Sequence, residues 1–189
     1  VQIVTVCDRE SDFYDFLELA QTIGAPALVR AHNDRIINKS SCLAEEGHDR
    51  LWGYMQSLPI QGSIKVEIPA RSQNPARTAT LEIRLGPFKI NPPRHSIRYK
   101  TEILPVINLH AVYVAEKNPP QDEDPLEWML LSNLPVTNFA EAIEKVRWYC
   151  LRWRIEMYHK VLKSGFRIES CRLESADRLI RYLTIMSII

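Results

Sequence analysis

The sequence predicts a layered α/β fold that is interrupted by a β-rich segment. Residues 1–31 follow a strand, helix, strand pattern, which is typical of a layered sheet. Residues 61–126 are instead dominated by short alternating or β-branched runs separated by Pro, Gly and Asn. We therefore predict a first part of an α/β core over residues 1–60, a β-rich insertion over 61–126, and a second part of the core over 127–189.

The first region begins with a run of β-branched and apolar residues over positions 1–7, which predicts a strand buried on both faces. A charged cluster follows at once over positions 8–12. The stretch Phe13–Ile23 has apolar residues at helical spacing and is followed by Gly24, so it predicts an amphipathic helix that ends at this glycine. Ala27–Ala31 then predicts a second strand.

The insertion is predicted from five short segments with strand character. These are Ser63–Pro69, Arg77–Leu85, Phe88–Asn91, Ile97–Val106 and Leu109–Ala115. Residues 118–125 contain three prolines and three acidic residues, which indicates an exposed connector. The segment Trp128–Ser132 then predicts a strand that returns to the core.

The last region is predicted to be helical. Thr137 is a candidate N-cap, because Glu141 follows at a spacing close to that of a capping box. The pattern indicates one long helix to about Ser164, ended by Gly165, and another helix over residues 176–189.

Composition is that of an ordinary globular domain. Of 189 residues, 46% are hydrophobic and 25% are charged, and the formal net charge is +1. Net charge therefore gives no argument for a polyanionic partner. The charges are nevertheless segregated: residues 61–100 carry eight basic and two acidic side chains, whereas residues 1–60 carry five and nine.

The four cysteines lie far apart without a CxxC spacing, which argues against a zinc site and a dense disulfide framework. No apolar run approaches the length of a membrane span, and no secretory leader is visible, so we expect a cytoplasmic protein without membrane contact. The chain opens on a strand pattern and stops within an apolar stretch, so we expect it to be cut from a longer protein.

One face of the predicted long helix concentrates polar side chains. Five residues fall within roughly an 80° arc when the helix is drawn at 100° per residue: Tyr149, Arg152, Glu156, Lys160 and Lys163. The opposite stripe, predicted to face the core, is Trp148, Leu151, Ile155, Tyr158 and Leu162.

Two interpretations of the polar face remain open. It is either a solvated face with ion pairs four residues apart, each worth about 0.2–0.5 kcal/mol, or a working face. In the second case Glu156 binds a divalent cation while the flanking cations hold phosphates.

Asp8 is the candidate partner of Glu156. It follows a buried strand, where a carboxylate leaves an α/β sheet at the edge that usually holds the site. The alternative is that Asp8 or Asp12 caps the helix beginning near Phe13, which is the interpretation we favour for Asp12. Carboxylate oxygens on two separate elements suit Mg²⁺ or Mn²⁺.

The sequence also resembles the insertion-sequence-four (Tn-five-like) family of DDE transposases. The resemblance rests on the pattern Tyr149-x2-Arg152-x3-Glu156-x6-Lys163 and on the segment Val6-Cys7-Asp8-Arg9-Glu10. Trp128 lies 28 residues before the glutamate, and Arg30 lies 22 residues after the aspartate, as in that family. The resemblance covers nearly the whole chain.

The resemblance implies a ribonuclease-H-like catalytic core, incomplete at its N-terminus, with a β-rich insertion. It further implies that Asp8 and Glu156 are catalytic metal ligands. Tyr149, Arg152 and Lys163 would contact transposon-end phosphates, and Lys160 would be an additional backbone contact. Trp128 would lie near a base flipped from the transposon end, the alternative being a buried strand tryptophan. Arg30 would be either a DNA contact or part of an ion pair at the edge of the core.

The implied reaction is two-metal phosphoryl transfer with Mg²⁺ or Mn²⁺, which cleaves and joins strands at transposon ends. The implied partners are double-stranded DNA, both transposon ends and target, and a second copy of the full-length parent. The implied location is the bacterial cytoplasm, in association with the nucleoid. The family's first catalytic Asp would lie upstream of this chain, so we expect the fragment alone to be inactive. A catalytically inactive or repurposed DNA-binding domain and another ribonuclease-H-like nuclease remain as alternatives.

Overall fold

The computed structural model describes six stretches of the chain, and it divides the chain into two compact units, Val1–Tyr149 and Cys150–Ile189. The described stretches are residues 2–37, 49–68, 75–93, 97–121, 123–165 and 175–186.

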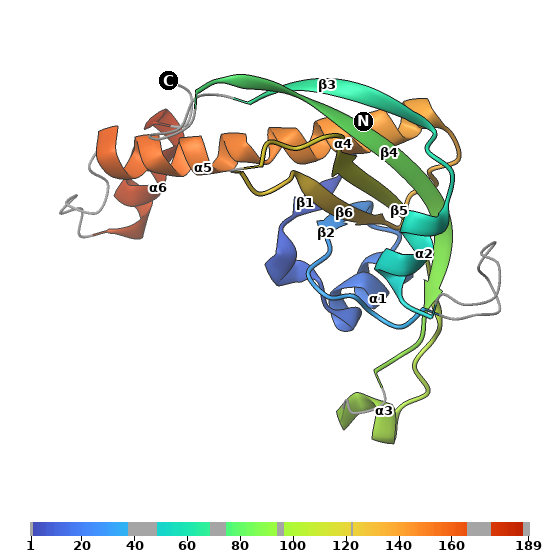
Figure 1. The fold of residues 1–189 in the computed structure, drawn as a ribbon. Helices are drawn as coiled ribbons and strands as arrows, with labels where there is room; N and C mark the ends of the chain where they lie inside the picture. The colour runs from blue at the N-terminus through green and yellow to red at the C-terminus, as the bar shows by residue number, and fades with distance from the viewer. Residues whose placement is uncertain are drawn as a thin grey trace. The chain divides into compact units, whose positions relative to one another are not determined.

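The first unit is built on a curled six-stranded sheet (Figure 1). In chain order the strands are β1 (Thr5–Cys7), β2 (Ala27–Arg30), β3 (Gly62–Ile68), β4 (Arg77–Ile90), β5 (Ile107–Glu116) and β6 (Glu127–Ser132). Their spatial order is β1-β2-β6-β5-β4-β3; β1 and β2 are parallel, and the other neighbours are antiparallel. The strands predicted for the insertion therefore extend the same sheet as β1 and β2.

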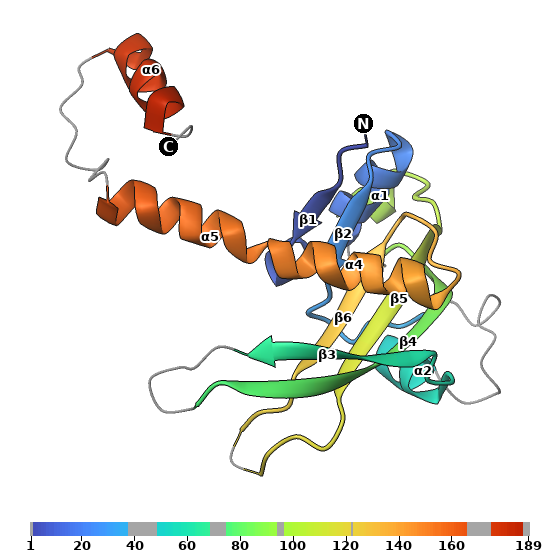
Figure 2. The same ribbon diagram turned by 90° about the horizontal axis from the view of Figure 1, so that it is seen from above.

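Helices cover both faces of this sheet. On one face lie α1 (Tyr14–Thr22) and α2 (Leu51–Ser57), and on the other lies α4 (Phe139–Leu151), as Figures 1 and 2 show. Side chains alternate between the two faces along each strand. On β5, Ala111 and Tyr113 enter the cluster formed with α1 and α2, whereas Val112 and Val114 enter the cluster formed with α4.

The predicted strand, helix, strand start is confirmed. Strand β1 is shorter than predicted, and the prediction that it is buried on both faces is wrong: β1 is an edge strand in which Thr5 is exposed and Val6 and Cys7 are half-buried. Helix α1 lies within the predicted range, and β2 ends one residue earlier. Gly24 follows α1 with a φ of 66°, the left-handed conformation that favours glycine. The helix α2 was not predicted.

Strand β4 is one continuous strand where two segments were predicted, and Pro87 lies inside it. Pairing with β3 stops at Ile83, so among the described strands β4 pairs only with β5 from Arg84 to Lys89; Ile90 then also forms an isolated bridge to Ile37. A proline is tolerated at such a position because no second ladder needs its missing N–H.

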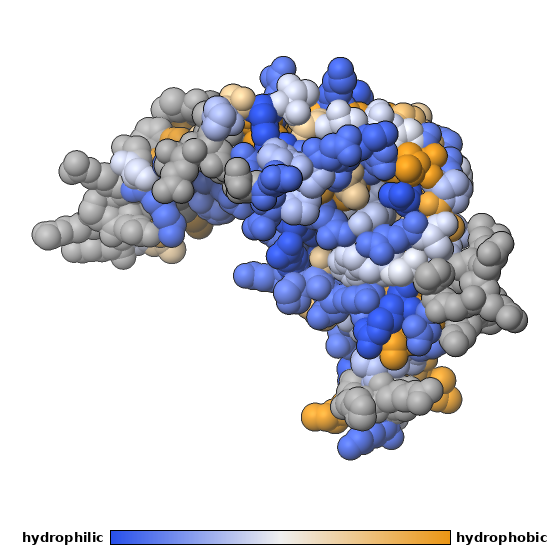
Figure 3. All heavy atoms as spheres, in the orientation of Figure 1, coloured by the Kyte–Doolittle hydropathy of each residue, from blue (hydrophilic) through white to orange (hydrophobic). Residues whose placement is uncertain are grey.

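The predicted strand Ile97–Val106 is wrong. Residues Ile97–Thr101 form a short helix, α3, with Arg98 paired to Glu102 one turn later. Arg98 also pairs with Asp15 of α1. Ile97 and Ile103 are 82% and 102% exposed, and Figure 3 shows apolar surface around α3.

Helix α4 is capped by Asn138 rather than by Thr137. The Asn138 side chain accepts a hydrogen bond from the Glu141 backbone N–H at 3.0 Å, and the Glu141 carboxylate accepts one from the Thr137 N–H at 2.6 Å. Glu141 thus reaches back to a backbone N–H as in a capping box, but it reaches Thr137, which lies one residue before the Asn138 cap. These contacts hold the pKa of Glu141 below its ordinary value, the Thr137 N–H being the main cause.

The predicted single long helix is divided at Arg152. It continues in the second unit as α5 (Trp153–Lys160) and a turn of π-helix, η3 (Val161–Gly165). Helix α6 spans Ala176–Met186, and the predicted continuation over residues 187–189 lies outside the described stretches. Within those stretches, no helix is long and apolar enough to cross a membrane.

Candidate functional site

Asp8 lies at the carboxyl end of β1. Its backbone is still extended, with φ −87° and ψ −175°, so it continues the alternation in which Val4 and Val6 pack against the α4 cluster. Asp8 therefore falls on the α4 face of the sheet. Its carboxylate accepts a hydrogen bond from the Arg9 N–H at 2.8 Å and so caps the 3-10 turn η1 (Arg9–Ser11), not the helix near Phe13.

Arg30 ends β2 directly beside this position. Cys7 and Val29 are register partners in the parallel pair, so Asp8 and Arg30 follow equivalent residues of adjacent strands. The Arg30 guanidinium donates to the Tyr149 hydroxyl and to the Glu127 carbonyl oxygen, each at 3.3 Å. Its central carbon lies 5.9 Å from the centre of the Tyr149 ring.

Trp128 completes this group. Its ring is half-buried, with its centre 5.5 Å from that of Tyr149 and an interplanar angle of 60°, a separation typical of interacting aromatic pairs. The structure thus brings together Arg30, Trp128 and Tyr149, which come from β2, β6 and α4. In these contacts Arg30 is bound to neutral oxygen atoms, and Trp128 is only partly covered by the core.

Asp12 does not cap α1, so that prediction is wrong. Its buried carboxylate accepts hydrogen bonds from the backbone N–H groups of His32 and Asn33 at 2.7 and 3.0 Å. It also forms an ion pair with Arg35. Asp12 therefore ties the loop after β1 to the loop after β2. Burial lowers the pKa of Arg35 from its ordinary value, an effect that the Asp12 carboxylate opposes.

In the second unit, Glu156 pairs with Arg152 at 2.9 Å. The Arg152 side chain is 18% exposed and that of Glu156 is 51% exposed. Lys160 and Lys163 are exposed on the turns that follow. The Arg152–Glu156 ion pair that the solvated-face interpretation predicts is therefore present. About half of the Glu156 side chain is still exposed, so the carboxylate is also accessible to a cation.

The predicted core-facing stripe of the long helix is confirmed at Trp148, which is partly buried and packs against the α4 cluster. It is wrong at Leu151, Ile155 and Tyr158, which are exposed. Leu151 and Ile155 are each 49% exposed, whereas Tyr149, from the predicted working face, is 5% exposed. The reason is the register of α4, which is set by Ala142 and Val146; Tyr149 continues their spacing toward the sheet. The Leu162 side chain lies outside the described residues.

The side chains proposed to hold a metal offer oxygen atoms only, the donor type that Mg²⁺ and Mn²⁺ prefer. Asp8 belongs to the first unit and Glu156 to the second. In the described part of the chain, no three His, Cys, Asp or Glu side chains are gathered closely enough to hold an ion. The donor chemistry of each carboxylate taken by itself fits the implied cation.

Glu127 and Tyr113 were missed by reasoning from the sequence. The Tyr113 hydroxyl donates to the Glu127 carboxylate at 2.5 Å, and burial is the main cause that raises the pKa of Tyr113. Only the pairing of β5 with β6 brings these residues together. The one available signal was the position of Glu127 next to Trp128.

A comparison with known protein families identifies the family of the chain. A sequence model described as the transposase DDE domain matches residues 24–189. The match includes Arg30, Trp128, Tyr149 and Glu156, and Asp8 precedes it. Transposases of this kind act on DNA. The chain belongs to the transposase DDE domain family.

Proposed function

We propose that this chain is the catalytic region of a DNA transposase of the insertion-sequence-four (Tn-five-like) family. Its reaction is metal-dependent phosphoryl transfer, which cleaves and joins strands at transposon ends. One observation chiefly supports the proposal: Asp8, Arg30, Trp128 and Tyr149 lie on the same face and at the same edge of one sheet. The carboxyl edge of parallel strands is where open α/β sheets commonly hold their sites.

Asp8 and Glu156 are proposed as two of the three carboxylates of the triad, with Mg²⁺ or Mn²⁺ as the cations they hold. Bound cations of this kind activate water or a 3′-hydroxyl and stabilise the leaving oxygen. The third carboxylate is the Asp that the family resemblance places ahead of Asp8 in the sequence. The proposed core is ribonuclease-H-like, with residues 61–126 as its insertion.

The cationic side chains are proposed to bind DNA, because each phosphate contact releases condensed counterions and raises affinity. Arg152, Lys160 and Lys163 contact transposon-end phosphates. Arg152 also holds Glu156 at 2.9 Å, so it orients that carboxylate as well. Tyr149 is buried, and it acts on DNA through Arg30, to which its hydroxyl is bonded.

Trp128 is proposed to occupy the space left by an extruded base of the transposon end, or to stack beside that base. An exposed part of an indole ring suits this role, since every base has a face on which an aromatic ring can stack. The DNA is double-stranded, and the active species is proposed to be a dimer of the full-length protein, acting at the bacterial nucleoid.

The test is Glu156→Gln in the full-length protein. The substitution preserves size and removes the charge, so we expect strand cleavage in Mg²⁺ to fall below detection while binding to transposon-end DNA stays within about twofold. Mn²⁺ binding, followed by electron paramagnetic resonance, should weaken in the same variant because a ligand is lost. Cleavage at the wild-type rate would exclude Glu156 from the triad.

Glu67→Gln is the matched control. Glu67 is an exposed glutamate of β3 and is not a member of the proposed triad. We expect this variant to cleave and to bind Mn²⁺ like the wild-type protein. A protein that binds DNA but does not cleave it even with both glutamates intact would instead be the repurposed DNA-binding domain.

A further inference from the structure

A hydrogen-bonded chain on the α2 face of the sheet ends at the strand that carries Trp128. The Gln56 side-chain amide, at the end of α2, donates to the Tyr113 hydroxyl at 3.2 Å. The Tyr113 hydroxyl in turn donates to Oε1 of Glu127 at 2.5 Å. Tyr113 is 5% exposed, so its hydroxyl sits where a lost partner is costly.

The Tyr113 ring is itself held in place from β4. The Arg84 guanidinium carbon lies 5.9 Å from the ring centre, and the Arg84 Nε donates to the Leu58 carbonyl oxygen at 3.0 Å. The cation is therefore anchored just beyond α2 and lies over the ring. Tyr113 presents a fixed hydroxyl to Glu127 rather than a mobile one.

Glu127 joins this chain to the proposed DNA-binding group on the other face. Its side chain bonds to Tyr113, and its backbone carbonyl accepts a hydrogen bond from Arg30 at 3.3 Å. Trp128 follows it directly and packs against Tyr149 on the α4 face. Glu127 is also the first residue of β6, where a strand end is prone to fray unless side chains hold it.

The charge of Glu127 argues against a direct role toward DNA. A carboxylate on the residue just before Trp128 opposes the approach of phosphates, so it reduces the local attraction of the site for a polyanion. Its hydrogen bonds to Tyr113 and, through its carbonyl, to Arg30 give it a different use.

We propose that Tyr113 and Glu127 are positioning residues, which fix the start of β6 so that Arg30 and Trp128 hold one arrangement for base extrusion. The role in base extrusion rests on the function proposed above, whereas the positioning of β6 does not. The Tyr113 hydroxyl needs only an acceptor oxygen on residue 127, not a negative charge. This difference distinguishes positioning from an electrostatic role.

The positioning is tested first without DNA. The protein is labelled with 5-fluorotryptophan, and the ¹⁹F signal of Trp128 is assigned by its loss in Trp128→Phe. Tyr113→Phe and Glu127→Ala should both shift or broaden this signal, while Glu127→Gln, which keeps an acceptor oxygen, should leave it close to wild type. Tyr113 and Trp128 lie on opposite faces of the sheet, so the change must pass through β6.

Tyr54→Phe is the matched control. Tyr54 is a fully buried tyrosine of the same core cluster, and its hydroxyl donates to the Pro87 carbonyl oxygen at 2.9 Å, on β4 rather than β6. This variant should lose a comparable amount of stability and leave the Trp128 signal in place. A Trp128 signal unchanged by Tyr113→Phe, or changed equally by Tyr54→Phe, would overturn the inference.

The consequence for DNA is measured in the full-length protein on transposon-end duplexes. Tyr113→Phe should slow the step that follows the first nick about three- to tenfold, the worth of one hydrogen bond, with DNA affinity changed less than twofold. A duplex with an abasic site at the extruded position should restore the rate, because no base then has to leave the stack. No slowing on the intact duplex, or no restoration on the abasic one, would overturn the base-extrusion role.

Failure of the proposed function is separately visible. If Arg30→Ala and Trp128→Ala process DNA at the wild-type rate while the Trp128 signal still responds to Tyr113→Phe, the positioning stands. In that case the DNA-binding role proposed for Arg30 and Trp128 is what fails.

Discussion

At the scale of single residues, position 62 has to be glycine because the ring of Phe139 covers it. A Cβ atom added at Gly62 would lie 2.5 Å from Cζ of Phe139, at the first residue of α4. The contact joins the start of β3 to the start of α4, so a side chain there must move the ring. Glycine at this position is a packing requirement.

We expect Gly62→Ala to lower the free energy of unfolding by about 1–3 kcal/mol, the usual cost of overpacking. Urea denaturation followed by circular dichroism measures it. Phe139→Leu in the Gly62→Ala background should recover part of the loss, because the smaller side chain vacates the space. Additive losses in the double variant would show that the ring contact is not the cause.

Asp12 is the buried carboxylate that fixes the loop after β2. We expect Asp12→Asn to cost about 2–4 kcal/mol, since it leaves the Arg35 guanidinium, at 15% exposure, without its counter-charge. Asp15→Asn is the control. Asp15 also forms an ion pair with an arginine, Arg98, but its side chain is 49% exposed, and exposed pairs contribute about 0–1 kcal/mol to stability. Thermal and urea unfolding of the two variants gives the comparison, and equal losses would contradict the assignment.

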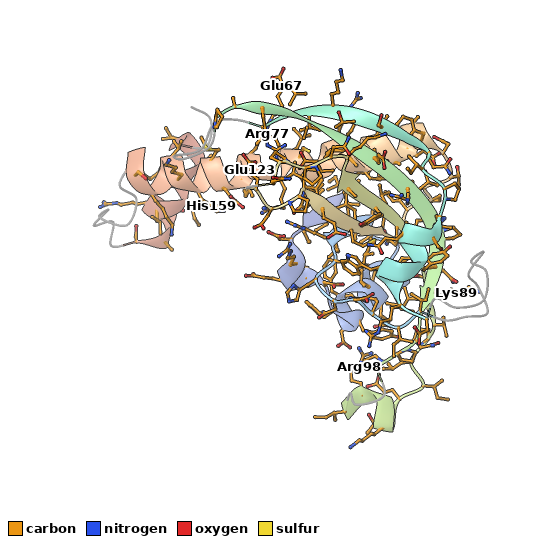
Figure 4. The ribbon with its side chains drawn as sticks, viewed as in Figure 1. Glu67, Arg77, Lys89, Arg98, Glu123 and His159 are labelled. Atoms are coloured by element: carbon orange, nitrogen blue, oxygen red, sulfur yellow. The ribbon has the colours of Figure 1, made fainter. Side chains whose placement is uncertain are left out.

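At the scale of elements, one cluster ties the connector to the sheet. Arg77 at the start of β4 pairs with Glu116 at the end of β5 and, at 2.8 Å, with Glu123 of the connector. Figure 4 labels Arg77 and Glu123, which lie close together. The Glu116 side chain, 2% exposed, also accepts a hydrogen bond from the Leu126 N–H at 3.1 Å. The cluster therefore holds the connector against two strands.

This cluster predicts a dependence of stability on pH. Hydrogen bonding to Arg77 holds the pKa of Glu116 below its ordinary value of 4.5, although burial acts the other way. A carboxylate whose pKa is depressed by folding stabilises the fold above its unfolded pKa, and the contribution is lost as pH falls through the folded pKa. Between pH 6 and pH 3 the unfolding free energy of the wild type should fall more steeply than that of Glu116→Gln. Parallel curves would contradict this assignment.

The helices show where reasoning from sequence succeeds and where it fails. Helix α1 was predicted well because its apolar spacing and its terminal Gly24 are local signals. The segment at Ile97 was predicted as a strand because isoleucine favours strands, but the tertiary pair between Arg98 and Asp15 accompanies a helical turn there. The intrinsic preference of such a short segment is weak, so its local pattern does not decide between a strand and a helical turn.

At the scale of the whole molecule, the proposed phosphate contacts predict how binding responds to salt. Lys160→Gln with Lys163→Gln should weaken transposon-end binding and reduce the slope of log affinity against log salt by about 2, because two fewer counterions are released. Fluorescence anisotropy between low and moderate salt measures the slope. Lys117→Gln, which removes a lysine paired with Glu82 at 3.1 Å, should leave the slope unchanged. An unchanged slope in the double variant would remove both lysines from the interface.

By itself, the sequence determined the α/β class, the strand that ends just before Asp8, and the strand that contains Trp128, since all are set by local apolar patterns and turn residues. Its motif spacing also indicated the family to which the chain belongs. Only the tertiary structure decided that Tyr149 is buried and that Arg30 donates a hydrogen bond to it. It also decided that Glu127 binds Tyr113 through its side chain and Arg30 through its backbone carbonyl. The physical reason is that strand pairing and helix register are fixed by packing between residues up to 119 positions apart, which no local pattern encodes.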